Sequence, residues 1–160
     1  TITLNEPYKV DFNYQVLVPF TFNSGLRIVY TDSVADMHKD LKDYEAEGIT
    51  LTATAFNTVP LDLNLKVIPR GIDGQDLSNE IEVGQALIKA ARGTSESDAV
   101  ETPVSITITL KQPSDLKKLD KLEFKIDANS ISSSELTSKQ YLILNAIRLK
   151  LNGQIIADFN

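Results

Sequence analysis

The chain has 160 residues and a formal net charge of −6. This length predicts a single domain over residues 1–160 that can bury an ordinary core. The acidic balance opposes attraction to nucleic acid and to anionic lipid, so neither is an expected partner. The chain has no cysteine and one histidine, His38, which excludes disulfides, Cys-based zinc sites and metal sites with two histidines. No apolar run approaches the ~20 residues that cross a bilayer, so no transmembrane segment is expected.

The first strand signal runs from Tyr8 to Phe22, where every even position is apolar. Apolar residues at every second position place one face of a strand in the core. Pro19 cannot donate a ladder hydrogen bond, so a kink is expected in the second half of this strand. A turn over residues 23–25 then precedes a short returning strand over 26–30.

A helix is predicted over residues 33–45. Ser33 occupies the expected N-cap position, and Gly48 follows the last helical turn. His38 is expected on the helix surface, without a functional role. The buried side of the helix is formed by apolar residues at spacings of three or four, which are Val34, Met37, Leu41 and Tyr44.

The clearest alternation flanks an interruption at Asn57-Thr58-Val59-Pro60. Apolar residues occupy every second position over 49–55 and again over 61–67, so each segment is predicted to be a strand with one buried face. Because Pro60 has no backbone N–H to donate, the chain must bend, break or pass from one sheet to another here. Such a corner is typical of a β-sandwich.

Two more strands are predicted over residues 104–110 and 122–128, where apolar and polar residues alternate without exception. The residues between them, 113–119, fit about one and a half helical turns. A strand over 81–91 has a weaker apolar face, because Gly84, Ala86 and Ala90 contribute little to it. The polar segment 93–98 is expected to form a loop between strands.

The last strong signals lie near the C-terminal end. Residues 141–151 are apolar on both parities at first, which predicts a central strand covered on both sides. Asn152-Gly153 is the residue pair that a type I′ hairpin turn prefers, so residues 154–159 are predicted to fold back on 141–151.

Together these segments give about eight or nine strands and two small helices. The pattern predicts an all-β fold, a two-sheet antiparallel sandwich of the immunoglobulin-like or jelly-roll kind, with one or two short helices in its connections.

No arrangement of residues predicts a catalytic site or a cofactor. Asp73 and Asp76 flank Gly74 in a loop that could offer oxygen ligands to calcium, but a plain Asp/Gly turn explains them without an ion and the further ligands that calcium needs are not visible nearby. Sugar-binding modules usually present exposed aromatic rings. This chain has no tryptophan, and each of its five tyrosines falls where a core position is expected.

Four segments of the sequence resemble a module of surface or periplasmic lipoproteins from Bacteroides-type bacteria. These segments are VPFTF at 18–22 with LRIVYTD at 26–32, NTVPLDLNL at 57–65, LKKLDKLEFKI at 116–126 and QYLILNAIRLKLNG at 140–153. The resemblance implies a β-sandwich that is exported to the cell surface or periplasm and anchored to the outer membrane through a lipidated N-terminus upstream of this sequence. It also implies glycan attachment at Asp-Ser-small apolar tripeptides, which Asp32-Ser33-Val34 fits, although an N-cap role explains Ser33 without any sugar.

These observations lead to two functional hypotheses. The first is a non-enzymatic structural or interaction module of an exported cell-envelope lipoprotein, with other cell-envelope proteins or domains as partners. The alternative is a carbohydrate-binding module associated with polysaccharide uptake, with glycans as ligands. A glycoside-processing enzyme is the least favoured hypothesis, because abundant carboxylates alone do not indicate a catalytic pair.

Overall fold

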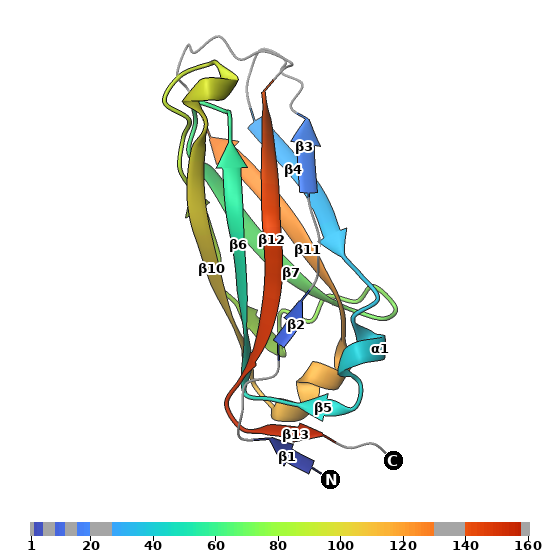
Figure 1. Cartoon of the computed structure of the whole chain (residues 1–160). Coiled ribbons are helices and arrows are strands. Elements are labelled where there is room, and N and C mark those ends of the chain that lie inside the picture. The colour runs from blue at the N-terminus through green and yellow to red at the C-terminus, as the bar shows by residue number, and fades with distance from the viewer. Residues whose placement is uncertain (1, 5–8, 12–15, 20–26, 130–139, 158–160) are drawn as a thin grey trace.

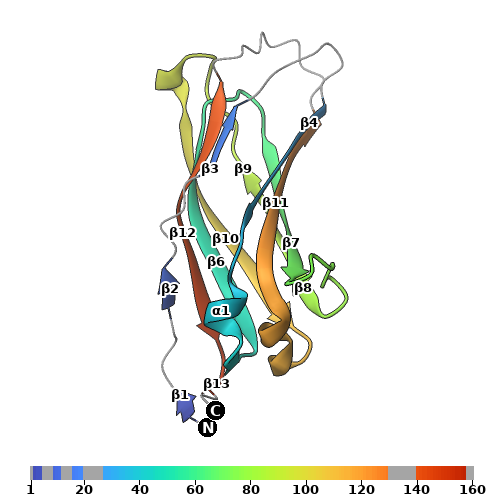
Figure 2. The same ribbon diagram turned by 90° about the vertical axis from the view of Figure 1, so that its right-hand side faces the viewer.

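The computed structural model describes residues 2–4, 9–11, 16–19, 27–129 and 140–157, and these build two facing antiparallel β-sheets (Figures 1 and 2). The first, the β6 sheet, has the strand order β2-β12-β6-β10-β8, and β3 also pairs with β12. The second, the β7 sheet, has the order β4-β11-β7-β9. The predicted two-sheet antiparallel sandwich is therefore confirmed.

The strands of the β6 sheet are β2 (Lys9–Asp11), β3 (Val16–Pro19), β6 (Gly48–Asn57), β8 (Ile81–Val83), β10 (Val100–Leu110) and β12 (Tyr141–Asn152). The strands of the β7 sheet are β4 (Arg27–Val34), β7 (Leu63–Gly71), β9 (Gln85–Ile88) and β11 (Leu119–Asn129).

A third, small sheet closes the lower end of the sandwich in Figure 1. It has the order β1-β13-β5, with β1 at Ile2–Leu4, β13 at Ile155–Ala157 and β5 at Tyr44–Glu45. The helix α1 (His38–Leu41) and the 3-10 helix η2 (Pro113–Lys118) lie at the same end, and the 3-10 helix η1 (Glu96–Asp98) lies at the other. The first and last described strands therefore pair with each other, with Ile2 opposite Ala157.

The core lies between the two sheets and follows the alternation in the sequence. Over β10, buried residues at even positions alternate with exposed ones from Thr102 to Leu110. Leu63 of β7 is fully buried, and Phe124 of β11 is 1% exposed. The buried faces predicted for 49–55, 61–67, 104–110 and 122–128 are confirmed, because side chains at every second position of a strand share one face.

The predicted corner after β6 carries the chain from one sheet to the other. Asn57 is fully buried there, and its side-chain Nδ2 donates to the carbonyl oxygens of Leu61 (3.2 Å) and Lys89 (2.9 Å). Its Oδ1 accepts the Val59 N–H at 2.9 Å. The single buried amide of Asn57 thus forms hydrogen bonds with three backbone groups, in place of the bonds that a neighbouring strand would supply.

The predicted helix over 33–45 is largely wrong. Strand β4 continues to Val34, with Ser33 opposite Glu123 and Val34 opposite Leu122 of β11, and α1 has only four residues. Asp36, at φ 63°, turns the chain between the two elements. Met37 and Leu41 are nevertheless buried as expected. The strand, the turn and the short helix together direct these apolar residues toward the core, as the predicted helix would have done. Pairing with β11 takes precedence over the weak local helix preference.

The weak strand predicted over 81–91 is two strands in different sheets. Strand β8 pairs with β10 of the β6 sheet, and β9 pairs with β7 of the β7 sheet. Gly84 lies between them and its N–H donates to Thr107 O at 3.0 Å. The segment has no single buried parity because it crosses the edge of the sandwich.

Strand β12 is central, as predicted, since it pairs with β6 on one side and with β2 and β3 on the other. Coverage of both its faces is not observed, because Ala146, Arg148 and Lys150 are exposed. The mixed parity at its start comes from Ile143, which is half-buried on the outer face, and a bulge follows between Asn145 and Arg148, where Ala146 has φ 51°. An extra residue in one strand moves the buried positions from even to odd numbers.

The hairpin predicted at Asn152-Gly153 is also wrong. Gly153 has the positive φ of a turn (79°), but Asn152 remains in β12 opposite Gly48. Beyond the turn, β13 pairs with β1 and β5 instead of folding back on β12. The glycine therefore redirects the chain into the small sheet that covers the lower end of the sandwich.

Substituting Gly153 with valine should be more damaging than the same change at Gly74, although both glycines have positive φ. A Cβ at Gly74 meets nothing within 4 Å, whereas one at Gly153 would lie 2.7 Å from the Glu47 Cβ. We expect Gly74→Val to cost about 1–2 kcal/mol from backbone strain. Gly153→Val should cost at least about 1 kcal/mol more, because it also overpacks. Urea unfolding of the two variants measures this difference, and equal losses would contradict the geometry at the turn.

Candidate functional site

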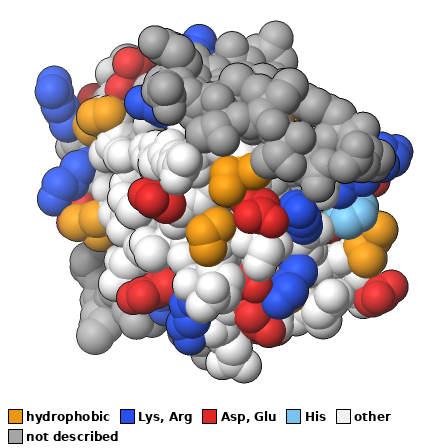
Figure 3. Space-filling view, turned by 90° about the horizontal axis from the view of Figure 1, so that it is seen from below, with side chains coloured by type: hydrophobic (Ala, Val, Ile, Leu, Met, Phe, Trp, Pro, Cys, Tyr) orange, Lys and Arg blue, Asp and Glu red, His pale blue; other side chains and the backbone are white. Residues whose placement is uncertain are grey.

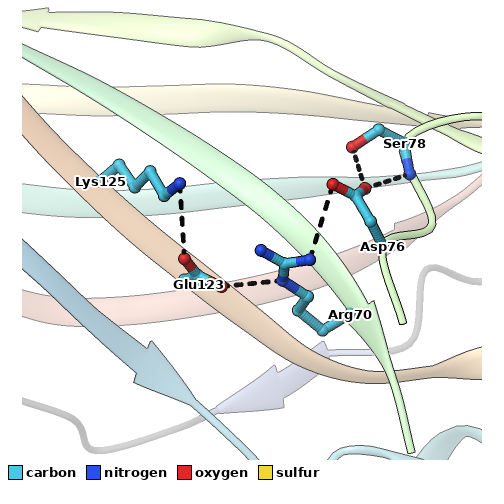
Figure 4. Close-up of polar contacts among 5 residues, drawn as sticks. All are labelled: Arg70, Asp76, Ser78, Glu123 and Lys125. Carbon is cyan, nitrogen blue, oxygen red and sulfur yellow. Dashed lines mark hydrogen bonds and ion pairs between the residues drawn. The ribbon is translucent and has the colours of Figure 1, made fainter. Parts of the chain in front are cut away.

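A cluster of charged side chains lies on the outer face of the β7 sheet (Figure 4). We call it the Arg70 cluster, and its members are Arg70, Asp76, Ser78, Glu123 and Lys125. Arg70 Nε donates to Glu123 Oε2 at 2.8 Å, and its Nη1 lies 3.6 Å from Asp76 Oδ2. Glu123 Oε1 lies 3.8 Å from Lys125 Nζ. Arg70 thereby ties the loop that carries Asp76 to strand β11.

Hydrogen bonds set the electrostatics of the Arg70 cluster. The Ser78 hydroxyl and backbone N–H both donate to Asp76 Oδ1, and together with the charge of Arg70 they lower the pKa of Asp76 below its usual value. The bond to Glu123 raises the pKa of Arg70 above its usual value. Arg70 and Asp76 are both stabilised in their ionised forms, as expected for a structural brace rather than for a proton-transfer centre.

The serine contributes most to the low pKa of Asp76, so Ser78→Ala should raise that pKa toward 3.8 by more than Arg70→Gln does. Because the folded pKa is depressed, Asp76 contributes stability above its unfolded pKa, and this contribution is lost as the pH falls through the folded value. Carboxyl carbon NMR titration of both variants measures the two shifts. A larger shift in Arg70→Gln would mean that the charge of Arg70 lowers the pKa of Asp76 more than the hydrogen bond from the Ser78 hydroxyl does.

The structure places the residues that the sequence suggested as ion ligands in different roles. Asp76 belongs to the Arg70 cluster, and the Asp73 backbone N–H donates to Gln75 Oε1 at 3.1 Å in the adjoining exposed turn. Within the described ranges, no three His, Asp or Glu side chains gather as a metal ion would require. Calcium binding by Asp73 and Asp76 stays a prediction, which a calorimetric calcium titration tests.

His38 and Ser33, the two other residues that the sequence analysis considered, both lie in ordinary structural positions. The His38 N–H donates to Asp120 Oδ1 at 3.2 Å, and its ring Nδ1 donates to Lys117 O at 2.9 Å, so the side chain joins α1 to η2. Ser33 lies in β4 and is not a helix N-cap. Glycosylation of Ser33 stays a prediction, which the intact mass of the protein from its native host tests.

A hollow of about 410 Å³ lies beside the Arg70 cluster, where the chain crosses from β8 to β9. Lys66, Lys125 and Gln85 contribute polar groups to its wall, and Ile68 and Val83 contribute apolar ones. Its full lining is Lys66, Val67, Ile68, Val83, Gly84, Gln85 and Lys125.

A second surface, which we call the Tyr141 patch, lies on the outer face of the β6 sheet and consists of Phe56, Tyr141, Ile143 and Glu96. The rings of Phe56 and Tyr141 stack with centroids 6.1 Å apart and planes inclined at 27°. Ile143 lies directly opposite Phe56, and the Tyr141 hydroxyl donates to Glu96 Oε1. Phe56, Tyr141 and Ile143 are all half-buried, so aromatic and aliphatic surface reaches solvent beside a carboxylate.

The position of Tyr141 in this patch is fixed by its backbone. Its N–H donates to Thr58 Oγ1 at 2.7 Å, and its carbonyl oxygen accepts the Thr58 N–H at 3.0 Å. The prediction that Tyr141 lies in the core is wrong, because its side chain is half-buried on the outer face. The sequence contained one signal for this patch. Phe56 directly follows Ala55, which is one of the alternating buried residues of β6, so its ring lies on the opposite, outer face of the strand.

Among the described side chains at the lower end of the molecule, no comparable cluster is present. In Figure 3, acidic and basic side chains are interspersed there and hydrophobic side chains are separated by polar ones. Among the described residues, none of the helices is long and apolar enough to cross a membrane.

The chain was compared with known proteins. No protein-family model matches it, and no curated protein matches it significantly. Among solved structures, it is similar to a protein from Parabacteroides distasonis that is thought to be secreted, with a TM-score of 0.59, 12% identity, and coverage of 79% of this chain and 38% of the other. The likeness shows a shared fold. The VP2 subviral particle of infectious bursal disease virus also matches, with a TM-score of 0.47, 10% identity, and coverage of 94% and 36%. This chain thus spans less than two fifths of the length of either protein.

Proposed function

We propose that this chain is a non-enzymatic interaction module of an exported cell-envelope protein and that it binds its partners through the Tyr141 patch. The observation that carries the proposal is the half-buried stacked pair of Phe56 and Tyr141 with its acidic neighbour Glu96. Aromatic side chains with a polar tip are enriched at the centres of protein interfaces, because they bury much area with few rotatable bonds.

The arrangement of the fold supports this role. Tyr141 begins β12 and Asn152 ends it, so the strand separates the patch from the paired strands β1 and β13 by about 36 Å. A module joined to further domains or to a lipid anchor at the β1 and β13 end would present the patch away from that junction (Figure 1). Export is supported by the fold shared with a protein thought to be secreted, and anchoring through an upstream lipidated N-terminus by the sequence resemblance.

The experiment compares partner capture by matched variants. The immobilised protein is incubated with the cell-envelope fraction of its native host, and bound proteins are quantified by mass spectrometry. Tyr141→Ala should reduce the capture of specific partners at least about tenfold, as loss of a central interface side chain does. Ile72→Ala removes a hydrophobic side chain that is 62% exposed and lies outside the patch, so it should leave capture unchanged. Equal capture by wild type and both variants would contradict the proposal.

The second candidate function is carbohydrate binding near polysaccharide-uptake machinery. The specific observation in its favour is again the Phe56 and Tyr141 pair, because sugar rings stack on aromatic faces and carboxylates such as Glu96 accept hydroxyl hydrogen bonds. A glycan array distinguishes the two candidates. Binding of a neutral glycan that Tyr141→Ala abolishes would favour this candidate over a protein partner, and signals at background would remove it.

A further inference from the structure

Three hydrogen-bond donors form one row across the outer face of the β7 sheet, and we call it the lysine row. Lys125 of β11 lies directly opposite Lys66 of β7, and Lys66 lies directly opposite Gln85 of β9. Residues directly opposite in a sheet share one face, with Cβ atoms about 5 Å apart. All three side chains also line the hollow of about 410 Å³ described above.

Two lysines directly opposite each other repel, so this pairing costs stability unless negative charge lies near. The nearest carboxylates balance it only partly. Lys66 Nζ lies 3.6 Å from Asp127 Oδ2, and Lys125 Nζ lies 3.8 Å from Glu123 Oε1. Charge-assisted hydrogen bonds are about 2.7–2.9 Å long, and Glu123 forms one with Arg70. Both ammonium groups are therefore loosely held, and their side chains are 54% and 42% exposed.

The hollow next to the row has the volume of a small-ligand site. Its volume falls in the range of about 300–1,000 Å³ that is usual for such sites. Gly84 places no side chain in it at the point where the chain passes between the sheets. Ile68 and Val83 add apolar surface to its lining beside the charged groups, so a ligand bound there would have one anionic and one apolar part.

We propose that the lysine row binds the carboxylate group of a small acidic ligand. The ammonium groups of Lys66 and Lys125 donate to the two carboxylate oxygens, the Gln85 amide donates to a further oxygen, and Ile68 and Val83 contact the apolar side of the ligand. Such a carboxylate can come from a free organic acid or from a uronic acid residue within an acidic polysaccharide. The site is separate from the Tyr141 patch and goes beyond the proposed function.

The test measures the binding of four probes to the full chain by calorimetry at low salt: glucuronate, an oligogalacturonate, benzoate and neutral glucose. We expect saturable binding of at least one carboxylate probe and none of glucose. Binding of glucuronate or oligogalacturonate alone identifies a uronic acid as the source, and binding of benzoate alone identifies a free acid. If no carboxylate probe shows saturable binding at concentrations up to about 10 mM, a site of millimolar affinity is excluded and the proposal is overturned.

Variants establish whether the row is responsible. The double variant Lys66→Gln with Lys125→Gln should weaken binding at least tenfold. The control double variant Lys42→Gln with Lys150→Gln removes the same charge from exposed lysines outside the row, so it should bind as the wild type does. An equal loss in both double variants would show a general charge effect and overturn the proposal. Tyr141→Ala should leave carboxylate binding unchanged, so this test can fail while the proposed function stands.

Discussion

Replacing Phe124 with alanine should lower the free energy of unfolding by about 3–5 kcal/mol. Phe124 is 1% exposed and lies on β11, which pairs with β4 on one side and β7 on the other. Removing the ring leaves a cavity between the two sheets that neither sheet can close, because both strands beside it are held in register. Equilibrium unfolding in urea measures the loss.

Phe56→Ala is the matched control for this prediction. Its ring is half-buried on the outer face of the β6 sheet and stacks on Tyr141, so its loss should cost only about 0.5–1.5 kcal/mol. A loss at Phe124 no larger than the loss at Phe56 would mean that the two sheets do not enclose Phe124.

Asn57→Leu should be comparably damaging, although leucine has a similar volume and is more hydrophobic. The substitution leaves the Val59 N–H and the carbonyl oxygens of Leu61 and Lys89 without their partner. Each buried unsatisfied polar group costs about 1–3 kcal/mol, so the total should reach about 3 kcal/mol or more. Thermal or urea unfolding measures it.

The control is Asn64→Leu on the outer face of β7, where the side chain is half-buried. This change should stay within about 0.5 kcal/mol, as surface substitutions usually do. If Asn57→Leu were as neutral as Asn64→Leu, the corner between β6 and β7 would be held by something other than the Asn57 amide.

The sequence predicted those parts of the fold that depend on local alternation. The buried faces of β6, β7, β10 and β11 follow from apolar residues at every second position. The interruption at Asn57-Thr58-Val59-Pro60 follows from the missing donor of Pro60, and of the bend, break or crossing that it allowed, the structure shows the crossing between sheets. The helical turns predicted over 113–119 appear as the 3-10 helix Pro113–Lys118. The predicted strand from Tyr8 to Phe22 is tested only at β2 and β3, which both pair with β12, and its other positions lie outside the described residues.

The parts of the fold that the sequence did not predict depend on partners far along the chain. The residues after Tyr30 fit a helix by spacing, but pairing with Glu123 and Leu122 keeps Ser33 and Val34 in a strand. Gly153 was identified as a turn residue, whereas the destination of the next strand depends on the pairing of Ala157 with Ile2. Local preferences of a few tenths of a kcal/mol cannot specify either outcome.

The candidate sites show the same division. Phe56 could be found from the sequence, because it follows Ala55 and so breaks the buried parity. The Arg70 cluster and the lysine row could not, because they join side chains from different strands far apart in the sequence, as in the bond of Arg70 to Glu123, 53 residues away. Only the register of β7 with β11 and β9 brings them together.

Photocrosslinking in the native host tests most directly whether the protein binds its partners through the Tyr141 patch. A photoreactive amino acid replaces Ile143, in the Tyr141 patch, or Ile72, which is exposed outside it. We predict that the probe at position 143 forms a discrete crosslink to a cell-envelope component, and that the probe at position 72 does not. Crosslinks from position 72 alone, or none from position 143 in cells that export the protein, would contradict binding through the Tyr141 patch.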